Sequence, residues 1–252
     1  MALWVSALLM AGAVQVAPQA DPGVAPARSK LFPIDPTAYL LGRFRADTTT
    51  DFVRLPPKIT DGRPAYLRTQ AARALTKMVT AAQEAGLALT VVSATRSYAA
   101  QRQIWNAKFT GARRSMGRNL AEAYPDTSER CLAILQYSSA PGLSRHHWGT
   151  DVDFNSTDPV YWQTGRGIAA LEWLTGNAQP FGFYMAYTQG REHGYRYEPW
   201  HWSYQPIARP LVRLYFDRLI SDEALTGFLG ASQVRELPWK RWYVEGVHEA
   251  LK

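Results

Sequence analysis

The sequence predicts a single α+β domain in which helices and strands are mixed along the chain. Amphipathic segments alternate irregularly with short β-branched segments, without the regular βαβ rhythm of a doubly wound sheet. The chain shows no internal repeats, and its composition does not change after residue 40. Hydrophobic residues make up 46% of its 252 residues, which suffices for a packed core and excludes a wholly disordered chain.

The first half of the domain is predicted to contain a helix, a strand and a second helix. Apolar residues recur at helical spacing over residues 69–85, and Gly86 ends that helix. Residues 87–94 (LALTVVSA) are apolar and β-branched, which indicates a buried strand. Ser97 is a suitable N-cap for a helix that runs to about Phe109.

The second half of the domain is predicted from shorter segments. Asp126-Thr-Ser-Glu129 is typical of a capping box that begins a helix through Tyr137. After a turn-rich segment we expect strands at 150–155 and 195–204, and helices at 167–177, 211–229 and 239–251.

The net charge of +7 favours acidic partners. Arg113, Arg114 and Arg118 form the one basic cluster, and we interpret it as a solvated loop. The chain has no zinc-finger motif and no aromatic-basic sheet signature, so nucleic acid is not an expected partner.

The N-terminus is typical of a secretory signal peptide, although no Lys or Arg precedes its apolar run. That run, residues 2–14, is too short to span a bilayer, which needs roughly 20 residues. We expect a signal peptide over 1–20, a Pro- and Ala-rich linker over 21–38 and one domain over 39–252. This predicts an exported, periplasmic or cell-envelope protein without an integral membrane segment; the alternatives are an apolar tail and a misassigned start.

Histidine and acidic residues gather in a first segment, Ser144 to Asp153, with a spacing suited to a metal site. Catalytic zinc takes three protein ligands from His, Asp and Glu. Here His146 lies in a turn, and Gly149 allows the backbone to bend into a strand. Asp151 and Asp153 lie two apart on one face of that strand, so either carboxylate could reach a metal held by the turn.

A second segment carries Glu198 and His201, which are three residues apart. On a regular strand they would face opposite sides, so a bend or a strand end near Pro199 is needed to direct both to one metal. A carboxylate beside the metal can accept a proton from the attacking water. The alternative interpretation is that His201, in a Trp-rich segment, is a hydrogen-bonded core residue.

Three elements in a fixed order resemble the VanY-type D-Ala-D-Ala carboxypeptidases, which are zinc peptidases in a group that includes lysostaphin-like enzymes and the hedgehog fold. They cover about residues 90–204. The resemblance implies a small antiparallel sheet that carries the zinc site and is flanked by helices. The elements are Ser93-Ala-Thr-Arg96-Ser97-Tyr98-x-x-Gln101, Ser144-x-His146-x-x-Gly149-x-x-x-Asp153 and Glu198-x-x-His201.

The resemblance assigns His146, Asp153 and His201 as ligands of one Zn²⁺ per chain. It assigns Glu198 as the general base that deprotonates the attacking water. It also implies zinc-dependent hydrolysis of a peptide bond in peptidoglycan stem peptides, foremost as a D-Ala-D-Ala carboxypeptidase. Alternatives with the same chemistry are a cross-link endopeptidase and a D,D-dipeptidase. We expect a monomer.

By the same resemblance Arg96 would polarise the scissile carbonyl, while Ser144 and Gln101 would bind the substrate. Two positions depart from the family pattern: Thr95 replaces an aromatic residue, and Asp151 replaces a small apolar one. Asp151 is therefore expected to orient a ligand histidine or to pair with an arginine. A non-catalytic zinc-bearing cell-wall-binding module is the alternative of another class, and it would need neither Glu198 nor Arg96.

Overall fold

The computed structural model describes residues 31–215 and 219–252. The expected signal peptide over 1–20 and the linker residues 21–30 lie outside the described residues. None of the described helices combines the length and the apolar character that crossing a bilayer requires.

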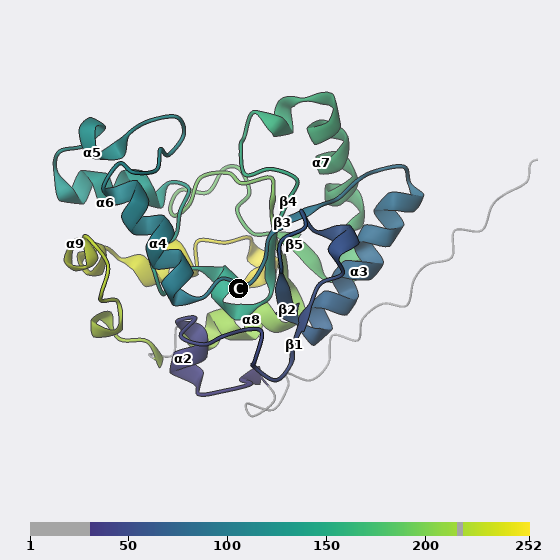
Figure 1. The fold of residues 1–252 in the computed structure, drawn as a ribbon, viewed down its shortest axis with the longest axis horizontal. Helices are drawn as coiled ribbons and strands as arrows, with labels where there is room; N and C mark the ends of the chain where they lie inside the picture. Colours follow the sequence, from purple (N-terminus) through teal and green to yellow (C-terminus); the bar gives the residue numbers. More distant parts are fainter. Residues whose placement is uncertain (1–30, 216–218) are drawn as a thin grey trace, which may run out of the picture.

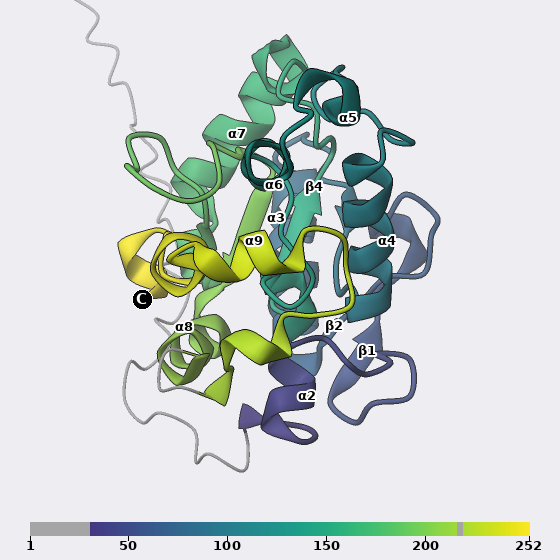
Figure 2. The ribbon, with the colours of Figure 1, turned by 90° about the vertical axis from the view of Figure 1, so that its left-hand side faces the viewer.

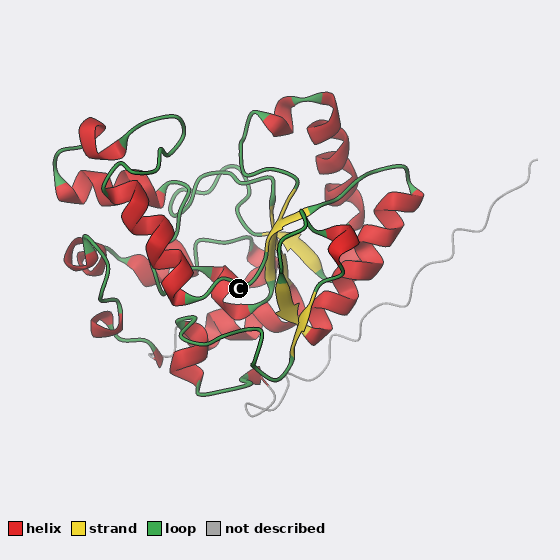
Figure 3. Ribbon diagram, in the orientation of Figure 1, coloured by secondary structure: helices red, strands yellow, loops and turns green. Residues whose placement is uncertain are grey.

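Two small antiparallel sheets form the β-structure, which confirms the predicted α+β class (Figure 3). The main sheet has the order β3-β4-β6-β5, and every neighbouring pair in it is antiparallel. Its strands are β3 (Val91–Ser93), β4 (Asp151–Phe154), β6 (His201–Tyr204) and β5 (Phe183–Met185), while β1 (Phe52–Arg54) pairs with β2 (Tyr66–Arg68) in the second sheet.

Helices flank the main sheet on both sides (Figure 1). On one side lie α3 (Thr69–Glu84) and α7 (Gly165–Asn177), and on the other lie α4 (Tyr98–Phe109), α5 (Leu120–Ala123) and α6 (Thr127–Leu135). Figure 2 shows α9 beside α6, and the further helices are α2 (Pro36–Leu40), α8 (Gln205–Leu214) and α9 (Ala231–Glu236).

The long helix α3 matches its prediction within a residue. Ala71, Leu75, Met78 and Ala82 all point into the core from one face. Gly86, with φ of +78°, takes the left-handed conformation that ends the helix.

Side-chain caps begin α4 and α6 where the sequence predicts them. The Ser97 hydroxyl accepts a hydrogen bond from the Ala100 amide at 3.2 Å. The Asp126 carboxylate accepts one from the Glu129 amide at 2.9 Å. Helix α6 ends at Leu135, two residues before the expected end.

The predicted C-terminal elements are too long. The strand expected over 195–204 comprises only His201–Tyr204, because Pro199 has no N–H to extend the ladder. The helix expected over 211–229 ends at Leu214 in the described chain, and Gly227 and Gly230 further on have left-handed φ angles.

The helix expected over 239–251 is instead two short turns, Lys240–Val244 and Glu249–Leu251. The chain bends sharply at Gly246, where a Cβ atom would lie 1.9 Å from the Trp242 carbonyl oxygen. This close approach of the backbone to itself excludes a continuous helix.

The residues that end the expected linker, 31–38, pack against the domain. The Leu31 and Phe32 side chains are buried in the core, and the Phe32 ring packs edge-on against Tyr39 at 5.8 Å between centroids. The Arg68 guanidinium donates to the Leu31 carbonyl. Two apolar side chains within a Pro- and Ala-rich stretch therefore pack this segment against the domain.

Candidate metal centre

Neighbouring elements of the main sheet bring His146, Asp153 and His201 together. His146 lies on the 3-10 turn η2 (Arg145–Trp148), and Asp153 and His201 face each other across the β4–β6 pair. One nitrogen or oxygen atom of each side chain lies within 4.8 Å of the others. All three residues are buried, so the three-residue group predicted from the sequence exists in the structure.

The turn between η2 and β4 requires a glycine. Gly149 has φ of +67°, which L-amino acids with a Cβ adopt at a cost. A Cβ atom there would also lie 2.3 Å from Cε1 of Phe52. The bend predicted at this position therefore separates His146 from the strand that carries Asp153.

The His146 imidazole has the tautomer that a metal ligand requires. Its Nδ1 donates to the Ala94 carbonyl oxygen at 2.8 Å, so Nε2 carries the free lone pair. Nε2 is buried, has no hydrogen-bond partner among the described residues and lies 3.3 Å from Oδ2 of Asp153. Burial and the Arg96 charge lower the pKa of His146, which keeps the ring neutral.

The His201 imidazole presents its other nitrogen to the same point. Its Nε2 donates to Oδ2 of Asp151 at 2.8 Å, which leaves Nδ1 at 3.2 Å from Oδ1 of Asp153 and 3.5 Å from Oε2 of Glu198. Burial lowers the pKa of His201, but these three carboxylates outweigh it and raise the pKa well above its ordinary value. The same excess of negative charge favours a divalent cation beside Nδ1.

The Asp153 carboxylate completes a donor set that fits zinc. Burial raises its pKa, yet His146 and His201 outweigh burial and hold the pKa well below the ordinary value, so the group is ionised. Its Oδ1 is buried without a hydrogen-bond partner, like Nε2 of His146. Two imidazole nitrogens and one carboxylate are the ligand set of many catalytic zinc sites.

Asp151 lies on the same strand face but is occupied elsewhere. It accepts hydrogen bonds from His201, from Arg145 Nε at 2.9 Å and from the Ser203 hydroxyl at 2.8 Å. Both charged partners, Arg145 and Asp151, are inaccessible to solvent. Asp151 therefore orients His201 and pairs with an arginine, which the sequence offered as two alternatives.

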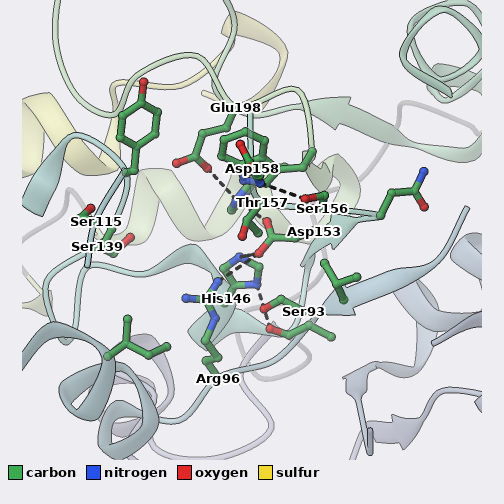
Figure 4. A pocket seen from close by; sticks show the side chains of 18 of the residues that line it. Ser93, Arg96, Ser115, Ser139, His146, Asp153, Ser156, Thr157, Asp158 and Glu198 are labelled. Atoms are coloured by element: carbon green, nitrogen blue, oxygen red, sulfur yellow. Dashed lines mark hydrogen bonds and ion pairs between the residues drawn. The ribbon is translucent and has the colours of Figure 1, made fainter. Parts of the chain in front are cut away.

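Glu198 and Arg96 flank the three-residue group (Figure 4). Glu198 lies three residues before the first residue of β6, and the His201 amide donates to its carbonyl across the turn at Pro199. Burial raises the pKa of Glu198, and His201 opposes that effect. The Arg96 guanidinium lies 3.3 Å from Asp153 Oδ2 and is 24% exposed.

Gln101 and Ser144 lie beside the centre, but neither lines the cavity in front of it. The Gln101 amide accepts from Arg96 at 2.9 Å and donates to the Ser139 carbonyl at 2.7 Å. Gln101 thus fixes the position of Arg96. The Ser144 hydroxyl is buried without a hydrogen-bond partner. Substrate binding by these two side chains stays a prediction.

A cavity of about 920 Å³ opens in front of the metal-site residues. In Figure 4 Ser115 and Ser139 lie on one side of the group, and the Ser156–Asp158 loop lies on the other. Arg113 and Arg114 are exposed, as predicted for a solvated loop, and they also form part of the rim.

Lys108, which was not predicted as a site residue, lies in the wall of this cavity with only 8% of its surface exposed. A signal was present, because Lys108 follows Gln101 by seven residues, or two helical turns. Gln101, Trp105 and Lys108 are the buried residues of α4, so one face of the helix carries all three.

The other histidines do not join the metal-site group. His147 is buried, and it donates through Nδ1 to the Arg96 carbonyl while Nε2 accepts from the Gly142 amide. Burial lowers its pKa to about 3, which fits a neutral structural residue. His193 is exposed and stacks on Trp242. His248 accepts a hydrogen bond from the Ala250 amide and is half-buried rather than solvated.

A buried His–Asp–His group on a small antiparallel sheet, with a glutamate beside it and a cavity in front, is typical of a catalytic zinc centre. A family model described as VanY, D-alanyl-D-alanine carboxypeptidase, matches residues 64–207, which is more than half of the chain. The chain therefore belongs to the VanY family.

Individual proteins of known sequence or structure are also similar to this chain. YodJ of Bacillus subtilis (strain 168) is 32% identical over 143 residues, which are 55% of this chain and 46% of YodJ, so the chain spans about half the length of that relative. The crystal structure of the vancomycin-resistance D,D-pentapeptidase VanY with Zn(II) has a TM-score of 0.47, with 23% identity over 69% of this chain and 94% of that one. The LdcB LD-carboxypeptidase has a TM-score of 0.48, with 22% identity over 81% and 79%.

Proposed function

We propose that this protein is a zinc-dependent peptidase that releases a terminal D-alanine from peptidoglycan stem peptides. The observation that carries the proposal is the buried His146–Asp153–His201 group with Glu198 beside it at the base of a large cavity. Membership in the VanY family supports the substrate class. Export, proposed from residues 1–20, would place the protein where such a substrate occurs.

His146 Nε2, His201 Nδ1 and an Asp153 oxygen would hold the zinc ion. When bound, zinc acts as a Lewis acid that polarises a carbonyl group and makes a water molecule more acidic. The hydrogen bonds from His146 to Ala94 and from His201 to Asp151 hold both rings in the required tautomers before any metal arrives.

Glu198 is the proposed general base. Its Oε2 lies 3.5 Å from His201 Nδ1, so it is at the position where a water attacking the scissile carbonyl would be deprotonated. Burial raises the pKa of Glu198, so its carboxylate accepts a proton from the attacking water more readily. The protonated carboxyl can then deliver that proton to the leaving amine.

Arg96 is the proposed electrostatic partner of the reacting carbonyl. Gln101 and Asp153 hold the two ends of its guanidinium, while Nε has no hydrogen-bond partner in the described chain. A fixed cation at the cavity wall stabilises negative charge that develops on the carbonyl oxygen during attack.

The size of the cavity favours a peptide over a free dipeptide. Drug-sized ligands fill pockets of roughly 300–1,000 Å³, and the cavity of about 920 Å³ is at the upper end of that range. Its walls extend from Glu198 to the Ser156–Asp158 loop and the Arg113–Gly117 loop, which leaves room for several residues of a stem peptide.

Mass spectrometry of purified muropeptides tests the proposal. Pentapeptides ending in D-Ala-D-Ala should lose one alanine in the presence of zinc, and the Glu198→Ala variant serves as the inactive control. Loss of the terminal residue from tetrapeptides alone would assign an L,D-carboxypeptidase instead, and splitting of cross-linked dimers would assign an endopeptidase. Absence of cleavage of all three substrates by zinc-loaded protein would contradict peptidase activity.

A further inference from the structure

Lys108 is a buried cation without a carboxylate partner. It lies in the last turn of α4, in the cavity wall, and its ammonium donates a hydrogen bond to the Ser138 hydroxyl. Among the residues that the structure describes, no carboxylate forms an ion pair with it. An ammonium has three N–H donors, so one neutral hydroxyl leaves most of its capacity unused.

Burying an ammonium group without a counter-charge is unfavourable. The pKa of Lys108 reflects this cost: burial lowers it to about 8, and the neighbouring Arg113 acts in the same direction. Glu198 opposes the shift, and Arg96 adds to it more weakly. The ammonium therefore lies in a region of net positive potential that an anionic ligand would neutralise.

The position of Lys108 relates it to the proposed chemistry. Lys108, Ser138, Glu198 and Arg96 line the same cavity, and the charges of Glu198 and Arg96 both act on Lys108. Ser139, which follows Ser138, also lines this cavity and lies to one side of the metal-site residues in Figure 4. A ligand group held here would lie in the same cavity as the metal-site residues.

We propose that Lys108 and the Ser138 hydroxyl form a subsite that binds a carboxylate of the peptide substrate. The inference rests on the proposed function, because it assigns part of the recognition of that substrate. The carboxylate is either the C-terminal one or that of an acidic residue within the peptide. In either case the ion pair between Lys108 and this carboxylate fixes how far the substrate peptide enters the cavity.

Steady-state kinetics of Lys108→Met test the subsite. We expect KM for a stem pentapeptide to rise about 10- to 100-fold with little change in kcat, since a hydrogen bond to a charged group contributes on that scale. Lys108→Gln keeps a donor for Ser138 but lacks the charge, so it should show the same rise. If KM rose only in Lys108→Met, Lys108 would serve to hold α4 to the loop after α6 that carries Ser138, and the subsite would be overturned.

Two control variants separate charge at this site from other effects. Lys77→Met removes an exposed lysine of α3 and lowers the net charge equally, so its KM should match the wild type. Ser138→Ala keeps the ammonium and should raise KM only a few-fold. An increase in Lys77→Met as large as that in Lys108→Met would also overturn the subsite, because it would reflect net charge alone.

Amidated peptides identify the carboxylate. One peptide carries a carboxamide on its internal acidic residue, and another, tested as a competitive inhibitor, carries a C-terminal amide. The penalty in Lys108→Met should vanish for the peptide that lacks the recognised carboxylate, whereas an equal penalty for all peptides overturns the inference. Wild-type turnover with an unchanged KM in Lys108→Met overturns only the subsite; absence of wild-type turnover overturns the proposed function as well.

Discussion

Two aspartates on one strand face have different roles because their neighbours differ. Asp153 faces the two imidazoles with an oxygen that has no hydrogen-bond partner, whereas Asp151 is held by Arg145, Ser203 and His201. Strand periodicity places both carboxylates on the same face and cannot choose between them, and only the resemblance to the VanY-type enzymes selected Asp153. The choice depends on Arg145, six residues earlier, whose side chain returns beneath the strand.

Asp151→Asn should weaken zinc binding about 10- to 100-fold, because the carboxylate that holds His201 in its tautomer is lost. Competition with a chromophoric chelator measures the dissociation constant directly. Glu172→Gln, at an exposed position of α7, changes the charge equally and serves as the control. Unchanged zinc affinity in Asp151→Asn would show that Asp151 does not affect how strongly His201 binds zinc.

Glu198→Ala should retain zinc while losing about 10²- to 10⁴-fold in kcat, the usual contribution of a general base. Metal analysis and kinetics on the same preparation check both halves of this prediction. Glu192→Ala, on an exposed loop, is the matched control. A Glu198→Ala enzyme with wild-type kcat would remove Glu198 from the reaction.

The pH dependence of Lys108 follows from its lowered pKa of about 8. Below pH 8 the ammonium is charged and binds a carboxylate, and above it the group loses its proton and that contribution. The ratio of kcat/KM between wild type and Lys108→Met should therefore fall toward one as the pH rises from 7 to 10. The charges that act on Lys108, those of Arg113, Arg96 and Glu198, remain in both proteins, so a ratio that stays constant with pH would contradict the assignment.

At the scale of elements, the turn between η2 and β4 determines whether the metal-site residues meet. Gly149→Ala combines a left-handed φ with a Cβ that would lie 2.3 Å from Phe52. We expect a loss of about 2–4 kcal/mol in the free energy of unfolding, measured with urea. Gly190→Ala has a similar φ of +77° but open space around the Cβ, so it should lose only about 1–2 kcal/mol. Equal losses of unfolding free energy in the two variants would mean that Phe52 moves aside at no cost and that the contact with it does not require a glycine.

At the scale of the whole molecule, zinc would connect the consecutive elements η2 and β4 to β6, which lies much further along the chain. A ligand that binds only the folded state stabilises it, by about 2.7 kcal/mol at a concentration of 100 times Kd. Removing zinc with a chelator should therefore lower the melting temperature, and added zinc should restore it. His146→Ala should show no such response at the same zinc concentration. A wild-type melting temperature that does not depend on zinc would contradict stabilisation of the folded protein by zinc at this site.

Several features of this protein depend on interactions between residues that are close in the chain, and these features could be predicted from the sequence alone. The resemblance to the VanY-type carboxypeptidases selected His146, Asp153 and His201. The spacing of apolar residues predicted α3, and Ser97 and Asp126 marked the starts of two helices. These features depend on residues that are close in the chain, so the sequence displays them directly. The two-residue period of a strand likewise placed both aspartates on one face.

Only the tertiary structure decided the remaining features, because they depend on contacts between distant residues. Arg145 and Ser203 assigned the role of Asp151, the Arg96 and Gly142 backbones made His147 structural, and packing against the Ser138 loop buried Lys108. The strand before His201 and the C-terminal helix proved shorter than predicted for local reasons that hydropathy does not report, namely the missing N–H of Pro199 and the close backbone approach at Gly246.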